Sequence, residues 1–225
     1  MLTNIYSIWK EYLNTKANVY NFYSSISLLI ITLLALTNFL TFVESRTGTI
    51  LSDPILESFN PVNLNWFIFL LIYLSVVISI LSLLPDPGNL LFLIQSYILM
   101  ILFRIAAMYV VPLNPPENTI LLNDPFVQYF TANQILTKDL FYSGHTATIF
   151  LIYLVSTNRS LKYLFLIFTF LIASSLLIQH VHYTIDILAA PFFSYGSYRL
   201  VKKLHYEFLV NESQNKEPIN YFGIN

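Results

Sequence analysis

The chain contains no cysteine among its 225 residues, which excludes disulfide bonds, catalysis by a thiol and metal sites built from thiolates. Charged residues are also scarce, at 10% of the sequence, and the formal net charge is −1. No basic run is present that could follow a phosphate backbone, so a nucleic-acid partner is not expected. Glycine occurs only 5 times, which argues against the broken helices that transporters use.

Apolar residues dominate the chain, because 56% of it is hydrophobic and 16% is aromatic. Such a composition lies far outside the range of soluble globular proteins and is typical of a membrane protein. A helix needs roughly 20 apolar residues to cross the hydrocarbon core of a bilayer. Six stretches approach this length, at about residues 22–43, 64–84, 90–111, 141–156, 161–181 and 183–200. The sequence therefore predicts an all-α, polytopic membrane protein with six transmembrane helices.

The six predicted helices form one domain, residues 22–201, between two more polar ends. Residues 1–21 carry lysines among aromatic residues and are expected to lie at the membrane interface. Residues 202–225 are expected to form a polar cytoplasmic tail, flexible from Asn211 onward. The loop at 112–140 is long for a helix connection and is either a substrate lid or a passive loop, with aromatic residues that suit the interface: Phe126, Tyr129 and Phe130.

Lysine and arginine are distributed unequally between the two sides of the predicted bundle. If the helices alternate in direction, the side of the termini holds eight of these residues, namely Lys10, Lys16, Arg159, Lys162, Arg199, Lys202, Lys203 and Lys216. The opposite side holds Arg46 and Lys138 in its two long loops. The positive-inside rule then predicts that both termini are cytoplasmic and that the long loops face away from the cytoplasm.

Two short motifs gather polar residues at the same predicted side of the membrane. Ser143-Gly144-His145-Thr146 opens the fourth span, and His182-Tyr183-Thr184-Ile185-Asp186 opens the sixth. His182 and Asp186 are four residues apart, so on a helix they share one face and the carboxylate can hold the imidazole in one tautomer. That pairing is suited to a nucleophile or a base.

Arg104 lies inside the third predicted span and Asp186 inside the sixth, where charge is costly and so indicates a functional site. Arg104 is eight residues before Pro112, about 12 Å below the outer end of its helix, in the same leaflet as both motifs. This convergence favours a catalytic site over separate structural hydrogen bonds, or over an arginine that only snorkels to the surface.

These residues suit phosphoryl transfer through a covalent phosphohistidine. In this interpretation His182 attacks phosphorus and Asp186 orients its ring, while His145 protonates the departing oxygen and then acts as a base on the acceptor. A zinc site built from the same three side chains is the alternative. The histidine–carboxylate pair is equally suited to hydrogen bonding and no further ligand recurs nearby, so we expect neither a metal nor another cofactor.

Other polar residues have predicted supporting roles. Ser143 as a helix N-cap, followed by Gly144, would present backbone N–H groups to a phosphate, and Arg104 would add a fixed cation. His180 neighbours His182 and is a candidate for a supporting role, although a lone histidine near a helix end is more often a cap. His205 is interpreted as a capping or interfacial residue.

Three segments resemble, in order and spacing, the sphingomyelin synthase branch of the type 2 phosphatidic acid phosphatase superfamily, six-helix membrane enzymes that act on lipid phosphates. Residues 104–112, Arg-Ile-Ala-Ala-Met-Tyr-Val-Val-Pro, are similar to that branch's arginine followed by Met-Tyr-Val and prolines. Residues 139–146, Asp-Leu-Phe-Tyr-Ser-Gly-His-Thr, are similar to its acidic residue followed by Phe-Ser-Gly-His-Thr. Residues 180–186, His-Val-His-Tyr-Thr-Ile-Asp, are similar to its His-Gly-His-Tyr-Thr-Ile-Asp.

The resemblance spans about residues 52–200 and implies a catalytic triad of His145, His182 and Asp186 that opens to the external or lumenal leaflet. Tyr183 joins the substrate-binding candidates and Asp139 the supporting ones. The chain departs from the animal enzymes at residues 137–138, where Thr-Lys stands in place of their Cys-Gly pair, and we do not expect it to carry the N-terminal cytoplasmic domain of some relatives.

Within the superfamily, the phosphatases have a lysine and arginine before a proline, and a second arginine six residues before the nucleophilic histidine. Here Tyr97 lies seven residues before Arg104, and Leu176 occupies the second position. A pocket with one cation suits a phosphodiester, which has one negative charge, better than a phosphomonoester, which has nearly two.

The sequence therefore predicts a lipid phosphotransferase. It would move a phospho-head-group, of phosphocholine or phosphoethanolamine type, from a glycerophospholipid to a lipid alcohol such as ceramide or diacylglycerol. The near alternative is a lipid phosphatase or phospholipase C-like hydrolase with water as the acceptor. A transporter is the alternative from another class.

Overall fold

The computed structural model describes residues 2–122 and 136–215, with side chains for residues 5–122 and 136–205. This part of the chain is helical, which confirms the predicted fold class. Its elements are α1 (Leu2–Tyr12), α2 (Lys16–Ser45), a 3-10 turn (Leu56–Ser58), α3 (Asn65–Leu83), α4 (Pro87–Val110), α6 (Gly144–Val155), α7 (Arg159–Ile178) and α8 (Thr184–Asn215). The aromatic residues of the long loop at 112–140, Phe126, Tyr129 and Phe130, lie outside the described residues.

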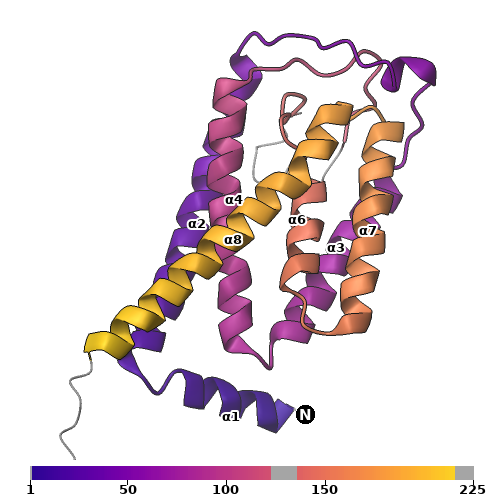
Figure 1. The fold of residues 1–225 in the computed structure, drawn as a ribbon. Coiled ribbons are helices and arrows are strands. Elements are labelled where there is room, and N and C mark those ends of the chain that lie inside the picture. The colour runs from indigo at the N-terminus through magenta and orange to yellow at the C-terminus, as the bar shows by residue number, and fades with distance from the viewer. Residues whose placement is uncertain (1, 123–135, 216–225) are drawn as a thin grey trace, which may run out of the picture.

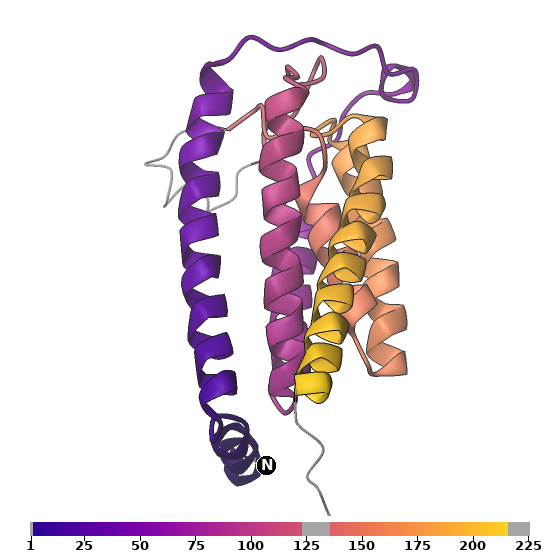
Figure 2. The same ribbon diagram turned by 60° about the vertical axis from the view of Figure 1, so that its left-hand side comes forward.

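The helices form an upright bundle around α4 and α6 (Figure 1). Helix α4 packs against α2, α6 and α8, and α6 packs against α3, α7 and α8. Helix α1 lies across one end of the bundle, near the end of α8 (Figures 1 and 2). The long connections after α2 and α4 lie at the opposite end, and we name them the outer connections and that end the outer end, by its distance from α1 alone. These two connections run side by side, because Thr49 and Leu113 form an isolated β-bridge.

Four helices, α2, α3, α4 and α7, are long and apolar enough to cross a membrane. Helix α6 has 12 residues, a length of about 18 Å against the roughly 30 Å of a hydrocarbon core. Its upper end lies below the upper ends of α4, α7 and α8 (Figures 1 and 2). The fourth predicted span, 141–156, therefore starts as a bent, non-helical segment within the bundle. Protein on all sides lets such backbone lie at this depth.

Helix α8 does not end at Leu200, where the sixth predicted span ends, but continues to Asn215. The sequence from 201 to 215 contains neither glycine nor proline, so its polar composition alone does not stop the helix. The predicted tail therefore begins as a continuous part of α8. At the other terminus, the indole N–H of Trp9 donates to the carbonyl of Leu84 at 2.8 Å and ties α1 to the turn between α3 and α4.

The buried core joins α3, α6 and α7 through the aliphatic and aromatic residues Ile68, Ile149, Phe165, Ile172 and Leu176. Helices α6 and α8 are joined in addition by a polar contact, since the Ser194 hydroxyl donates to the carbonyl of Ala147 at 2.7 Å. Small hydroxyl residues let two helices approach closely and link them without burying an unsatisfied polar group. The two helices that follow the sequence motifs are therefore fixed against each other.

Candidate active site

The starts of α6 and α8 meet through their backbones. Ser143 caps α6, because its Oγ accepts the N–H of Thr146 at 3.4 Å, as its position before the helix predicts. The backbone N–H of Ser143 also donates to the carbonyl of Asp186 at 3.2 Å. This bond joins the two motifs, which lie about forty residues apart in the sequence, at the recessed end of α6.

His182 and Asp186 are in contact, with 3.2 Å between Nδ1 of the imidazole and Oδ2 of the carboxylate. They do not share one helix as predicted, because α8 begins only at Thr184 and His182 lies in the turn before it. The two side chains are 2% and 0% exposed. Oδ2 also accepts the backbone N–H of Tyr183 at 3.2 Å, which fixes the carboxylate at the start of α8. With a proton on Nδ1 held by Asp186, the lone pair of Nε2 is the nucleophilic position of the ring.

Arg104 is buried in the bundle and does not snorkel to the surface. Its Nη1 donates to the carbonyl of Tyr142 at 2.6 Å, and its Nη2 forms an ion pair with Oδ1 of Asp139 at 2.5 Å. The guanidinium therefore holds the bent, non-helical segment that leads into Ser143. Asp139, which the sequence predicts in a supporting role, is therefore in direct contact with Arg104, one of the phosphate-binding candidates.

The pKa of the Asp139 carboxyl depends on the charged groups around it. Burial acts to raise its pKa, but the Arg104 guanidinium, together with the nearby imidazoles of His182 and His145, holds the pKa below its usual value. Asp139 is therefore ionised at neutral pH. The geometry joins this ion pair to both motifs, because Arg104 lies against Gly144 at the start of α6 and the N–H of Ser143 binds the carbonyl of Asp186 in α8.

Gly144 is required by space at this turn. A Cβ added at this position would lie 2.6 Å from Cζ of Arg104 and would overlap its Nη1. The absent side chain lets the guanidinium lie directly against the first turn of α6. A helix N-terminus with an adjacent guanidinium is a favourable environment for phosphoryl oxygens.

Tyr183 and His180 lie on the outer side of His182. The Tyr183 hydroxyl accepts the N–H of Leu51 at 3.2 Å and donates to the carbonyl of Asn114 at 3.0 Å, so it binds both outer connections. His180 lines a cleft between these connections. His205 lies elsewhere, where its Nε2 contacts Oε1 of Gln95 on α4 at 2.5 Å. Its side chain therefore joins α8 to α4, a contact between helices that was not predicted for a capping or interfacial residue.

Sequence reasoning missed Asp53, which caps α8 from the outer connection after α2. Its Oδ2 accepts the N–H of Thr184 at 2.6 Å, and its Oδ1 accepts the Thr184 hydroxyl at 3.0 Å. The two residues are 131 positions apart, so no local pattern signals the contact. Asp53 thereby holds the start of the helix that carries Asp186.

Replacement of Asp53 by alanine is expected to lower stability by about 1–2 kcal/mol at neutral pH, because α8 loses its N-cap. Burial opposes the charge on Asp53, but its hydrogen bonds with Thr184, Leu56 and Ile55 hold its pKa below the usual value. The stabilisation is thus complete above the pKa of an unfolded aspartate, about 3.9, and is lost as pH falls through the folded value. Thermal unfolding in detergent at several pH values measures it.

In that experiment the difference between the wild type and Asp53→Ala should shrink as the pH falls below about 4. Asp86→Asn, which alters the N-cap of α4 at the other end of the bundle, is the matched comparison for a local cap. Equal stability of Asp53→Ala and the wild type at neutral pH would contradict the capping role.

Glu44, at the end of α2, is a second residue that sequence reasoning missed. Its carboxylate accepts the N–H and hydroxyl of Thr137, at 2.9 Å and 2.6 Å, and the N–H of Lys138 at 3.1 Å. The Lys138 ammonium in turn donates to the carbonyls of Glu44 and Arg46 at the C-terminus of α2. Thr137 and Lys138 thus anchor the segment that carries Asp139 to the end of α2.

Residues 138–204 match the family model of the PAP2 superfamily C-terminal domain. No curated protein matches the chain. The matched region contains the segment from Asp139 to Thr146 and the segment from His180 to Asp186, but it excludes Arg104 and Asp53. The match covers less than half of the chain and shows that this part is similar to the C-terminal domain of the PAP2 superfamily.

Proposed function

We propose that the protein is a lipid phosphotransferase that moves a phospho-head-group, of the phosphocholine or phosphoethanolamine type, between lipids through a phosphohistidine on His182. The observation that carries the proposal is the buried contact of His182 with Asp186, at 3.2 Å, which the Ser143-Gly144 turn joins to the ion pair of Arg104 with Asp139. The charge bias of the loops supports an outward-facing site.

The reaction takes place in two steps. Nε2 of His182 attacks phosphorus, the bond from phosphorus to the diacylglycerol oxygen breaks, and His145 gives its proton to that oxygen. The hydroxyl of a lipid alcohol such as ceramide or diacylglycerol then gives its proton to His145 and attacks phosphorus, and the phosphorus–nitrogen bond breaks. Asp186 stabilises the imidazolium, and Arg104 with the N–H groups of the Ser143-Gly144 turn stabilises the charged oxygens.

Charge balance supports a phosphodiester substrate. Arg104 is the fixed cation that contacts these motifs among the described residues, and Asp139 already compensates part of its charge. A phosphomonoester has nearly two negative charges and would be poorly matched, whereas a phosphodiester has one. Head-group transfer therefore fits this cluster better than hydrolysis of phosphatidic acid.

The products of purified protein in liposomes test this proposal. With head-group-labelled glycerophospholipid and ceramide present, we expect the label to appear in a new lipid. Unlabelled diacylglycerol should form in an amount equal to that lipid, with little free phospho-head-group. Omission of ceramide should slow release of diacylglycerol, because the phosphohistidine then waits for an acceptor. If free phospho-head-group is instead the main product with or without ceramide, the protein is a phospholipase C-like hydrolase.

A further inference from the structure

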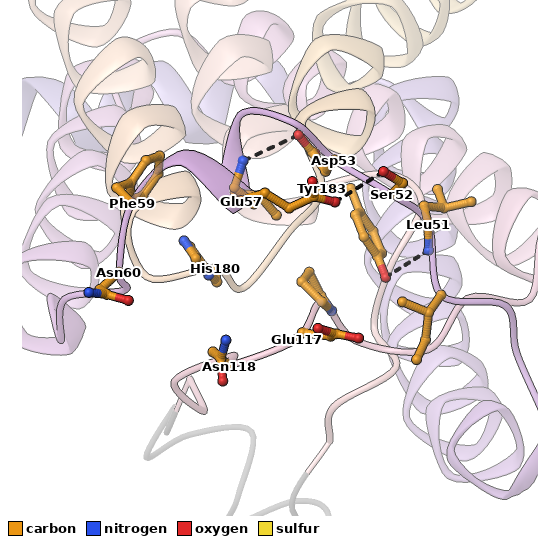
Figure 3. Close-up of a pocket in the computed structure, with 13 residues that line it drawn as sticks. Leu51, Ser52, Asp53, Glu57, Phe59, Asn60, Glu117, Asn118, His180 and Tyr183 are labelled. Atoms are coloured by element: carbon orange, nitrogen blue, oxygen red, sulfur yellow. Dashed lines mark hydrogen bonds between the residues drawn. The ribbon is translucent and has the colours of Figure 1, made fainter.

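A cleft of about 360 Å³ lies between the two outer connections and the loop before α8 (Figure 3). Its walls come from residues 50–60, from residues 116–118, and from His180 and Tyr183. None of the described residues that line it belongs to the catalytic cluster of His145, His182, Asp186 and Arg104. It adjoins that cluster through Tyr183, a predicted substrate-binding residue whose backbone N–H binds Asp186, and lies on the outer side of it.

The cleft is negatively charged. Three carboxylates line it, from Asp53, Glu57 and Glu117, and no lysine or arginine is among its described lining residues. Asp53 is buried in the wall, where it caps α8, whereas Glu57 and Glu117 are exposed to an incoming ligand. Figure 3 shows the latter two side chains on opposite walls. Such a cleft attracts a cation.

His180 is an unusual residue in the wall. It follows α7 with a φ of 56°, in a Schellman turn where its N–H bonds Leu177 and the N–H of Val181 bonds Leu176. Glycine is the usual residue there, because a side chain strains this backbone. The imidazole is 4% exposed, and neither ring nitrogen has a hydrogen-bond partner within the described part of the chain. Buried polar groups without partners are rare and unfavourable, which indicates a ligand.

The residues that line the cleft suit a primary ammonium better than a metal ion or a quaternary ammonium. No group of three histidine, aspartate or glutamate side chains among the described residues is placed to hold a metal ion, which favours an organic cation. A quaternary ammonium binds to open aromatic faces. The ring of Phe59 instead packs T-shaped against the imidazole of His180, with 5.1 Å between the two ring centroids. A primary ammonium instead has three N–H donors for the carboxylates, and a hydroxyl can donate to or accept from an imidazole.

We propose that this cleft binds the protonated primary amine of an amino alcohol such as ethanolamine, either free or as a lipid head group. Glu57 and Glu117 accept from the ammonium, and the hydroxyl or ester oxygen lies beside His180. The proposal does not depend on the proposed function, because binding is measured without turnover.

Equilibrium binding of labelled ethanolamine to the full chain in an uncharged detergent tests the proposal. We expect saturable binding that unlabelled ethanolamine displaces, with choline at least tenfold weaker and the neutral isostere 1-propanol ineffective. The double variant Glu57→Gln with Glu117→Gln should bind at least tenfold more weakly, whereas Glu11→Gln on α1 should bind like the wild type. Competition by 1-propanol as strong as that by ethanolamine, or unchanged binding by the double variant, would overturn it.

His180→Gly separates binding from folding. Glycine suits the left-handed backbone at this position, so the thermal midpoint should not fall, while affinity for ethanolamine should drop at least fivefold. Unchanged affinity in this variant would also overturn the proposal. Nanodiscs with phosphatidylethanolamine identify the source of the amine. If phosphatidylethanolamine nanodiscs compete with ethanolamine and phosphatidylglycerol nanodiscs do not, the ligand is a lipid head group. If ethanolamine binds and neither kind of nanodisc competes, the ligand is the free amino alcohol.

Discussion

Replacement of His182 by alanine is expected to lower lipid turnover by about 10⁴-fold or more, because the proposed covalent route loses its nucleophile. Incubation with glycerophospholipid labelled at phosphorus should place label on the wild-type protein in an acid-labile, base-stable form, as expected of phosphohistidine. His182→Ala should carry none. Turnover under single-turnover conditions and label on the denatured protein measure the two effects.

Two further variants make the His182 result specific. Asp186→Asn keeps the shape of the side chain but weakens its hold on the imidazolium, so turnover should fall by about 10²-fold or more while the protein still folds. His205→Ala removes another imidazole, one in contact with Gln95 on α4, and should keep most of the activity. If the His182→Ala protein still acquires the phosphorus label and still turns over lipid at a substantial rate, His182 is not the nucleophile.

The helices could be predicted from sequence because apolar runs of spanning length report directly on burial in lipid. Their ends could not. Helix α8 passes the predicted end at Leu200 because nothing in the polar sequence that follows breaks a helix. Helix α6 begins only at Gly144, because Ser143 caps it and the residues before it are drawn into contact with Arg104. Hydropathy does not register either effect.

The site divides into local contacts, which spacing predicts, and distant ones, which it does not. The contact of His182 with Asp186 and the cap by Ser143 span four and three residues, so the turns that begin α8 and α6 determine them, although His182 itself precedes α8. The contacts of Arg104 with Asp139 and of Asp53 with Thr184 span 35 and 131 positions. They depend on how the connections fold over the bundle. The family match adds no information on Arg104 or Asp53, because it begins at residue 138.

Gly144→Ala is expected to lower kcat/KM by about 10²-fold, because the new methyl group would displace the guanidinium of Arg104 from the turn. The group in its way is the far end of a flexible side chain, so the protein can fold by moving the guanidinium. That movement would weaken its contacts with the Tyr142 carbonyl and Asp139. Activity should therefore fall much more than stability. Kinetics in liposomes and thermal unfolding of the same preparation measure the two.

Gly196→Ala is the matched control, because it adds the same methyl group to α8 where no atom lies within 4 Å. It should keep wild-type kinetics and raise stability by about 0.5–1 kcal/mol, the usual gain from alanine over glycine inside a helix. Arg104→Gln combined with Gly144→Ala should be scarcely worse than Arg104→Gln alone, since both changes act on the same guanidinium. If the two losses multiply instead, Gly144 acts independently of Arg104, and the methyl group obstructs the phosphate itself.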